Sequence, residues 1–238
     1  MRILITNDDG IDSIGLKILV DFAKKIGDVI VVAPKVEQSA MSHALKIKGK
    51  IECMKIDKGF NVPTYYVDST PADCVRYAYY GLEEEFDYVF SGINRGFNVG
   101  EDIMYSGTVA AATEAATLGK KSLAFSTSHT SFKGSEDCLN IIWKYINEEK
   151  LFNVWNLYNI NFDSEKAKNV VITKQGDCNF QTTFEKEGND YYQRGVPCFE
   201  SGIDKIYLDT SETMNGFISI TPLVYNRTNE NIYNKIKK

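Results

Sequence analysis

Short apolar runs alternate with helical periods along the first half of the chain. Ile3-Leu4-Ile5 and the run 28–34 have the composition of buried strands. Between them, 14–26 carries apolar residues at a helical spacing that ends at Gly27. Further strands are predicted at 44–56, 64–67, 86–91 and 122–126, and further helices at 70–80, 107–118 and 135–148. Strands that alternate with helices predict a mostly parallel, doubly wound α/β sheet.

The pattern becomes looser beyond residue 151. Two runs, 170–173 and 217–221, have strand character, and polar stretches with glycines separate them. The tail 229–238 is a short, weakly amphipathic helix. A helix of this length cannot bury itself alone, so we expect it to dock on the body or on a partner.

Two adjacent acids follow the first predicted strand, in Asn7-Asp8-Asp9-Gly10. Ligands of α/β sheets bind beyond the carboxyl ends of the strands, which places Asp8 and Asp9 at the functional edge. Gly10 tolerates the positive φ that a sharp exit from a strand needs. An ordinary solvated Asp-Gly turn is the alternative, and the position of the pair favours a site.

Two further loops carry oxygen-bearing side chains to the same edge. One holds Gln38-Ser39, and the other is the glycine-rich stretch 92–100 with Asn94 and Asn98. Each loop alone is weak evidence, because Ser and Asn are common in turns. Together with the two acids they suit a hard divalent cation such as Mg²⁺, Mn²⁺ or Ca²⁺ rather than zinc.

The helix at 107–118 opens with Ser106-Gly107-Thr108. Ser106 is a good N-cap residue, and the free amides of a first helical turn can bind an anion such as phosphate. Caps of this kind also begin helices that bind nothing, so the segment alone leaves both interpretations open. The chain has two histidines. His43 shares a loop with Ser39 and is a hypothetical proton donor to a leaving group, whereas His129 is better explained as a surface residue.

Composition narrows the class of protein. A net charge of −5 over 238 residues argues against a stable nucleic-acid partner. The glycines of 92–96 do not form the dinucleotide fingerprint, which disfavours a nicotinamide enzyme. Five scattered cysteines without a C-x-x-C spacing favour reduced thiols over a zinc site or disulfides. The N-terminus has no signal-peptide stretch and no run is long enough to span a membrane, so we expect a cytoplasmic protein.

Five motifs occur in order along the chain: Asn7-Asp8-Asp9-Gly10, Ala33-Pro34 with Gln38-Ser39, Thr70-Pro71-Ala72-Asp73-Cys74-Val75, Ser91-Gly92-Ile93-Asn94-Arg95-Gly96 and Tyr105-Ser106-Gly107-Thr108-Val109. Together they resemble the SurE survival-protein family, which consists of metal-dependent 5′/3′-nucleotidases acting on nucleoside monophosphates. The stretch 216–223 is similar to the family's C-terminal strand motif. One departure is Asn159-Ile160-Asn161-Phe162-Asp163, where many relatives have Asn-Val-Asn followed closely by proline.

The resemblance implies one divalent metal per subunit, Mg²⁺ or Mn²⁺ with Ca²⁺ as an alternative occupant. Its ligands would be Asp8, Asp9, Ser39 and Asn94, with catalytic roles for Asp8, Asp9 and Asn94 and phosphate contacts from Ser106, Gly107, Thr108 and Asn98. It also implies a Rossmann-like catalytic core over 1–150. The region 151–238 would complete the sheet and supply an extended hairpin and a tail helix for exchange between subunits of a homodimer or homotetramer.

The reaction expected from these features is phosphomonoester hydrolysis of nucleoside 5′- and 3′-monophosphates. A phosphatase that forms a covalent aspartyl-phosphate at Asp8 is one alternative, although haloacid-dehalogenase-like enzymes place their two acids two residues apart. A nucleotide- or metal-binding module without turnover is the other.

Overall fold

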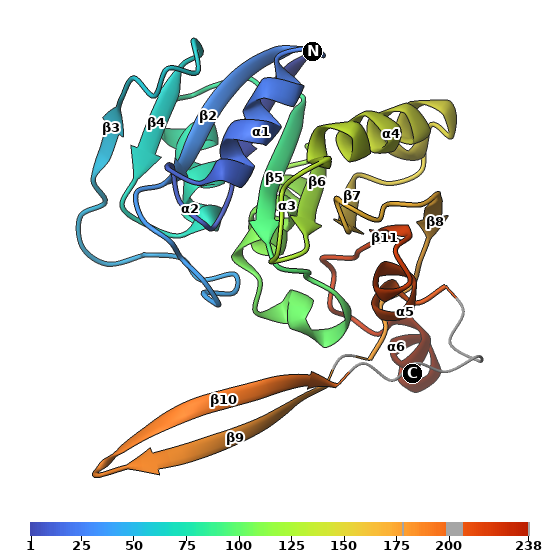
Figure 1. The fold of residues 1–238 in the computed structure, drawn as a ribbon. Coiled ribbons are helices and arrows are strands. Elements are labelled where there is room, and N and C mark those ends of the chain that lie inside the picture. Colours follow the sequence, from blue (N-terminus) through green and yellow to red (C-terminus); the bar gives the residue numbers. More distant parts are fainter. Residues whose placement is uncertain (178, 199–206, 238) are drawn as a thin grey trace.

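The computed structural model describes residues 1–177, 179–198 and 207–237. Within these residues one mixed sheet of nine strands forms the body, in the order β3-β4-β2-β1-β5-β6-β7-β11-β8 (Figure 1). The strands are β1 Arg2–Thr6, β2 Asp28–Pro34, β3 Cys53–Lys55, β4 Thr64–Val67, β5 Tyr88–Arg95, β6 Lys121–Thr127, β7 Leu157–Phe162, β8 Val170–Ile172 and β11 Ile218–Pro222. The strands from β4 to β7 pair in parallel, while β3 and β11 are antiparallel to their neighbours β4 and β7.

Helices cover both faces of this sheet (Figure 1). The helices of the described residues are α1 Ile14–Ala23, α2 Pro71–Arg76, α3 Gly107–Thr117, α4 Ser135–Glu148, α5 Asp209–Met214 and α6 Glu230–Ile236, with a π-helix at Tyr77–Gly81 and 3₁₀ turns at Gly100–Met104 and Leu151–Asn153. Successive strand residues point to opposite faces. Ile3 and Ile5 of β1 therefore pack in the core under α1 and α4, and Leu4 packs in the core under α2 and α3. The doubly wound α/β prediction is confirmed.

Several predicted boundaries are closely matched. The strand at 28–34 and the helix at 135–148 have the observed bounds. Thr70 caps α2 by accepting a hydrogen bond from the Asp73 N–H at 3.2 Å, as the cap signature predicts. The helix does not continue as a regular α-helix to residue 80, because it widens into the π-helix after Arg76.

Three predictions from the pattern are wrong in part. Most of 44–56 is irregular, and only Cys53–Lys55 pairs as the edge strand β3. The stretch 92–95 was expected in a loop but belongs to β5, which continues past an irregularity between Ser91 and Asn94. The strand β7 was not predicted, because asparagines at 159 and 161 interrupt its apolar pattern although the strand is fully buried.

The C-terminal region completes the sheet with β7, β11 and β8, and it also sends out a hairpin. Strands β9 Asn179–Glu187 and β10 Asp190–Cys198 form a separate two-stranded sheet that projects from the body (Figure 1). The tail helix α6 is present as predicted and is exposed along its length. In the part of the chain that the structure describes, no helix has the length and apolar character needed to cross a membrane.

The cysteines agree with the expected thiol state as far as they are described. Cys53, Cys74 and Cys138 are unpaired. Cys178 and the side chain of Cys198 lie outside the described residues.

Candidate active site

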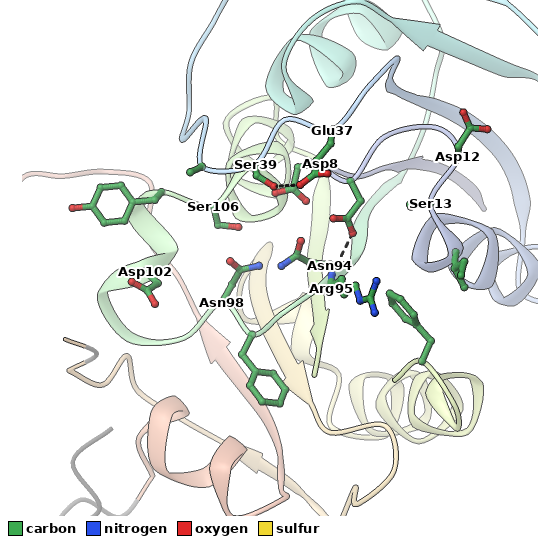
Figure 2. A pocket seen from close by; sticks show the side chains of 16 residues that line it. Asp8, Asp12, Ser13, Glu37, Ser39, Asn94, Arg95, Asn98, Asp102 and Ser106 are labelled. Carbon is green, nitrogen blue, oxygen red and sulfur yellow. Dashed lines mark hydrogen bonds between the residues drawn. The ribbon is translucent and has the colours of Figure 1, made fainter. Parts of the chain in front are cut away.

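A cleft of about 670 Å³ opens at the carboxyl ends of β1 and β5, the edge that the sequence predicts (Figure 2). Six of the predicted site residues line it: Asp8, Asp9, Ser39, Asn94, Asn98 and Ser106. Gly107 and Thr108 lie behind Asp8, and His43 lies outside this cleft. The loops and the helix start inferred from separate motifs therefore meet at one place.

The turn after β1 is fixed by Asn7. Its side-chain N–H groups donate to the Gly10 carbonyl at 2.9 Å and to Ser13 Oγ at 2.8 Å. Gly10 has φ +91°, the left-handed conformation that glycine adopts without strain. The backbone carbonyl of Asp8 accepts a hydrogen bond from the Gln38 N–H at 2.8 Å, which ties the Ser39 loop to the turn.

The Asp8 carboxylate is buried, with 6% of the residue exposed. Burial raises the pKa of Asp8 to about 6, even though hydrogen bonds from Thr108 act in the opposite direction. The ion pairs found within the described residues do not include Asp8. A buried carboxylate without a positive partner is a costly arrangement, and a bound cation would relieve it.

Helix α3 begins directly against this carboxylate. Ser106 caps the helix by accepting a hydrogen bond from the Val109 N–H at 3.1 Å, as predicted. A Cβ atom at Gly107 would lie 2.9 Å from Asp8 Cβ, so only glycine allows this approach. Thr108 is fully buried and its hydroxyl donates to Asp8 Oδ1. The structure thus places Thr108 on the carboxylate rather than in the open cleft.

The second acid is half-buried and faces two charged neighbours. Asp9 Oδ2 accepts a hydrogen bond from the Arg95 backbone N–H at 3.2 Å. Burial raises the pKa of Asp9, and the charge of Glu37 contributes in the same direction. Ser39 Oγ donates to Glu37 Oε1 at 2.6 Å, so this serine and Glu37 lie together beside the two acids (Figure 2).

Asn94 reaches the cleft from β5 itself. Its Nδ2 donates to the Gly96 carbonyl at 2.8 Å, which fixes the side-chain amide. No hydrogen bond from the described residues reaches its Oδ1. The backbone beside it needs glycine, because a Cβ at Gly92 would lie 2.4 Å from the Phe125 carbonyl oxygen.

His43 lies in a neighbouring cleft of about 570 Å³ that shares Ser106 with the first. Its Nε2 is 2.8 Å from Glu114 Oε2, and Arg76 donates to the other carboxylate oxygen at 2.8 Å. This arrangement anchors the 35–46 loop on α3 and α2. The structure does not bring His43 to the acids, and its proton-donor role stays a prediction.

The sequence pattern alone did not identify several residues of the site. Glu37 and Arg95 line the cleft beside predicted residues. Asn159 and Asn161 hold the loop that carries Asn98. The signal that could have found the asparagines is their two-residue spacing within an otherwise apolar run, which puts both on one face of a strand.

The cleft has a strongly negative lining. Arg95 is the one Lys or Arg side chain that lines it among the described residues, whereas the carboxylates are Asp8, Asp9, Asp12, Glu37 and Asp102. Across the part of the chain that the structure describes, no group of three or more His, Cys, Asp or Glu side chains is arranged so that it could hold a metal ion. A cation here would need neutral oxygen donors in addition to the two adjacent acids, and Ser39 and Asn94 offer such donors.

Comparisons with known proteins agree with the motifs. The chain matches the family model described as survival protein SurE over residues 3–182. A Clostridium botulinum (strain ATCC 19397 / Type A) protein named 5′-nucleotidase SurE is 39% identical over 246 residues, which cover 98% of this chain and 96% of that protein. A protein of the same name from Natranaerobius thermophilus is 35% identical, covering 99% of this chain and 97% of its own length.

A solved structure is similar as well. The crystal structure of the SurE protein from Aquifex aeolicus superposes with a TM-score of 0.82 at 31% identity, covering 100% of this chain and 98% of that one. The resemblance inferred from the motifs is confirmed, and this chain belongs to the SurE survival-protein family.

Proposed function

We propose that this chain is a phosphomonoesterase that hydrolyses nucleoside 5′-monophosphates to nucleoside and phosphate. The observation that carries the proposal is the buried Asp8 carboxylate, which shares one cleft with Asp9, Ser39 and Asn94 beside the start of α3. Relatives that align over nearly the whole chain bear the name 5′-nucleotidase. We propose in addition that the protein hydrolyses nucleoside 3′-monophosphates.

A divalent cation fits the donor chemistry of this cleft. Asp8 and Asp9 would provide two negative charges, and Ser39 Oγ and Asn94 Oδ1 would provide neutral oxygens, a set that suits Mg²⁺ or Mn²⁺, with Ca²⁺ as an alternative occupant. The five carboxylates that line the cleft would repel an anionic phosphate, so binding of the substrate calls for added positive charge. Bound there, one such cation per subunit would supply Lewis-acid chemistry, which polarises a phosphoryl group and lowers the pKa of water.

The remaining groups of the chain bind and orient the phosphate. Ser106 and Asn98 line the cleft and can donate to phosphoryl oxygens, while Arg95 adds a positive charge. The Thr108 hydroxyl holds Asp8 in place from behind. Fixed donors of this kind lower the barrier because they need no reorganisation when charge develops on phosphorus.

A phosphate-release assay on purified protein tests the activity and separates it from the two alternatives. The 5′- and 3′-monophosphates of each base are supplied with Mg²⁺ or Mn²⁺. Turnover above that of the protein without metal supports the hydrolase. Tight nucleotide binding with no phosphate release supports the binding module. Trapping of a phosphorylated Asp8 supports the covalent route.

We also propose that the projecting hairpin joins two copies of the chain, giving a homodimer that can pair into a tetramer. Phe184 and Tyr191 on the hairpin are 64% and 61% exposed, so a second copy that covered the hairpin would remove this apolar surface from water. Sedimentation of the wild type and of a Phe184→Ser/Tyr191→Ser variant tests this: the variant should be monomeric at concentrations where the wild type is not. The cytoplasmic location stays a prediction.

A further inference from the structure

The loop after β5 carries Asn98 into the cleft, and side chains from a distant strand hold its backbone. The Asn98 N–H donates to Asn161 Oδ1 at 2.8 Å. The Asn98 carbonyl accepts from Asn161 Nδ2 at 2.9 Å and from Asn159 Nδ2 at 2.8 Å. Both polar groups of the Asn98 backbone are therefore bound by β7, about sixty residues later in the chain.

The register of the sheet explains how one side of β7 can do this. Asn159 and Asn161 are two residues apart and share a face, whereas Ile160 and Phe162 point into the hydrophobic core on the other face. Asn161 pairs with Ser126 of the neighbouring strand β6. Ser126 Oγ accepts from Asn98 Nδ2 at 2.8 Å, so β7 holds the backbone of Asn98 and β6 holds its side chain.

The two contacts at position 161 require a side-chain amide. The side-chain amide has an acceptor and a donor, so Asn161 binds both the N–H and the carbonyl of one residue. Aspartate lacks the donor and would place a charge where the residue is fully buried.

Stability of the core does not explain the pair. Asn159 and Asn161 are both 0% exposed, and Asn159 Oδ1 is buried with no hydrogen-bond partner in the described residues. An unpartnered buried polar atom costs free energy, and apolar residues would fill a strand of this kind without that cost. We therefore attribute the presence of Asn159 and Asn161 to the hydrogen bonds by which they hold the loop that carries Asn98.

We propose that Asn159 and Asn161 are positioning residues that fix Asn98 at the phosphate side of the cleft. The expected effect on turnover rests on the proposed phosphomonoesterase function, whereas the expected effect on the mobility of the Asn98 loop does not. Asn98 lines the same cleft as Asp8 and Ser106. A loop that drifts by a fraction of an ångström would misplace the Asn98 donor at the reacting phosphate.

Kinetics of three variants test the proposal. In Asn161→Ala, kcat should fall by roughly 10- to 100-fold while KM changes less, because a misplaced donor costs most in the transition state. Asn159→Ala leaves both hydrogen bonds of Asn161 in place and should give a smaller loss of kcat. If Asn161→Ala does not fold, Asn159→Ala provides the test in its place. Tyr158→Phe is the matched control. It removes one hydrogen bond from the same strand, the 2.8 Å bond to the Leu151 carbonyl, and should keep the wild-type kcat.

Two further measurements separate positioning from a general loss of stability. In an Asn98→Ala background, Asn161→Ala should have little additional effect on kcat, because the side chain to be positioned is absent. Hydrogen exchange at the Asn98 amide should become faster in folded Asn161→Ala and stay slow in Tyr158→Phe. This exchange is measured without substrate, so a wild type that releases no phosphate overturns the proposed function and leaves the positioning test intact. Unchanged exchange, wild-type kcat in folded Asn161→Ala, or fully additive losses in the double variant would overturn the inference.

Discussion

The Thr108 hydroxyl donates a hydrogen bond to Asp8 Oδ1, joining the first turn of α3 to the end of β1 across a hundred residues of chain. Both residues are buried, so this bond fixes the carboxylate from the side away from the cleft. Partners that orient a ligand in this way typically affect metal affinity or activity by about 10- to 100-fold.

We predict that Thr108→Val, which keeps the shape but lacks the hydroxyl, lowers kcat/KM for a nucleoside 5′-monophosphate by about 10- to 100-fold. Thr108→Ser restores the donor and should recover most of the loss. Steady-state phosphate release checks both variants. Equal rates for Thr108→Val and the wild type would show that the hydrogen bond from Thr108 to Asp8 is not needed for activity.

Gly107→Ala should inactivate the protein through a steric effect. The new Cβ would meet Asp8 Cβ at 2.9 Å and Asp8 Oδ2 at 3.1 Å, so either the helix or the carboxylate must move. A shift of this kind should cost on the order of 100-fold in kcat/KM. Thr117→Ala, at the exposed far end of the same helix, is the control and should behave as the wild type. Full activity in Gly107→Ala would mean that the approach of α3 to Asp8 is not required.

Cation binding should stabilise the fold independently of catalysis. A ligand that binds only the folded state at about 100 times its Kd adds about 2.7 kcal/mol. We therefore predict that Mg²⁺ or Mn²⁺ raises the thermal midpoint of chelator-treated wild type and does not raise that of Asp8→Asn. Asp12→Asn removes an exposed carboxylate that pairs with Lys58 at the rim of the same cleft, and it should keep the response. The same rise in Asp8→Asn as in the wild type would place the cation elsewhere.

Glu114 should make stability depend on pH. Burial alone would raise the pKa of Glu114, but the hydrogen bonds from His43 and Arg76 outweigh it and lower the pKa below the ordinary value of 4.5. The folded state therefore holds the proton more weakly than the unfolded chain. The stabilisation is present above the unfolded pKa and is lost as the pH falls through the folded one.

At neutral pH the wild type should be more stable than Glu114→Gln by about 1–3 kcal/mol, measured by denaturant unfolding. The difference should shrink as the pH falls below the ordinary glutamate pKa of 4.5 and through the lower pKa of the folded state. Glu136→Gln removes an exposed ion pair with Lys25 and should cost less than about 1 kcal/mol at any pH. A difference between Glu114→Gln and wild type that did not vary with pH would contradict the assignment.

The sequence predicts the parts of this protein whose signals are local. The apolar run of β1, the Thr70 cap of α2 and the Ser106 cap of α3 each have a physical cause within a few residues. The edge of the sheet at which Asp8, Ser39 and Asn94 meet follows from strand polarity, and the structure places all three there.

Features that depend on distant contacts could not be predicted in this way. β7 was missed because Asn159 and Asn161 are bound to a loop about sixty residues earlier, which no local pattern records. His43 was associated with the acids through its loop, but Glu114 on α3 holds it in the neighbouring cleft. In 44–56, the Ala44 carbonyl accepts a hydrogen bond from Thr70 Oγ1 and the Lys46 N–H donates to Asp73 Oδ2, so side chains more than twenty residues away bind this backbone in place of a neighbouring strand.

The most direct measurement is phosphate release from a nucleoside 5′-monophosphate by chelator-treated protein, before and after Mg²⁺ or Mn²⁺ is restored, for the wild type and for folded Asp8→Asn. We predict no release from either protein without metal, recovery in the wild type when metal returns, and no recovery in Asp8→Asn. Release at the wild-type rate by Asp8→Asn, or no release by the metal-restored wild type, would contradict a metal-dependent hydrolase centred on Asp8.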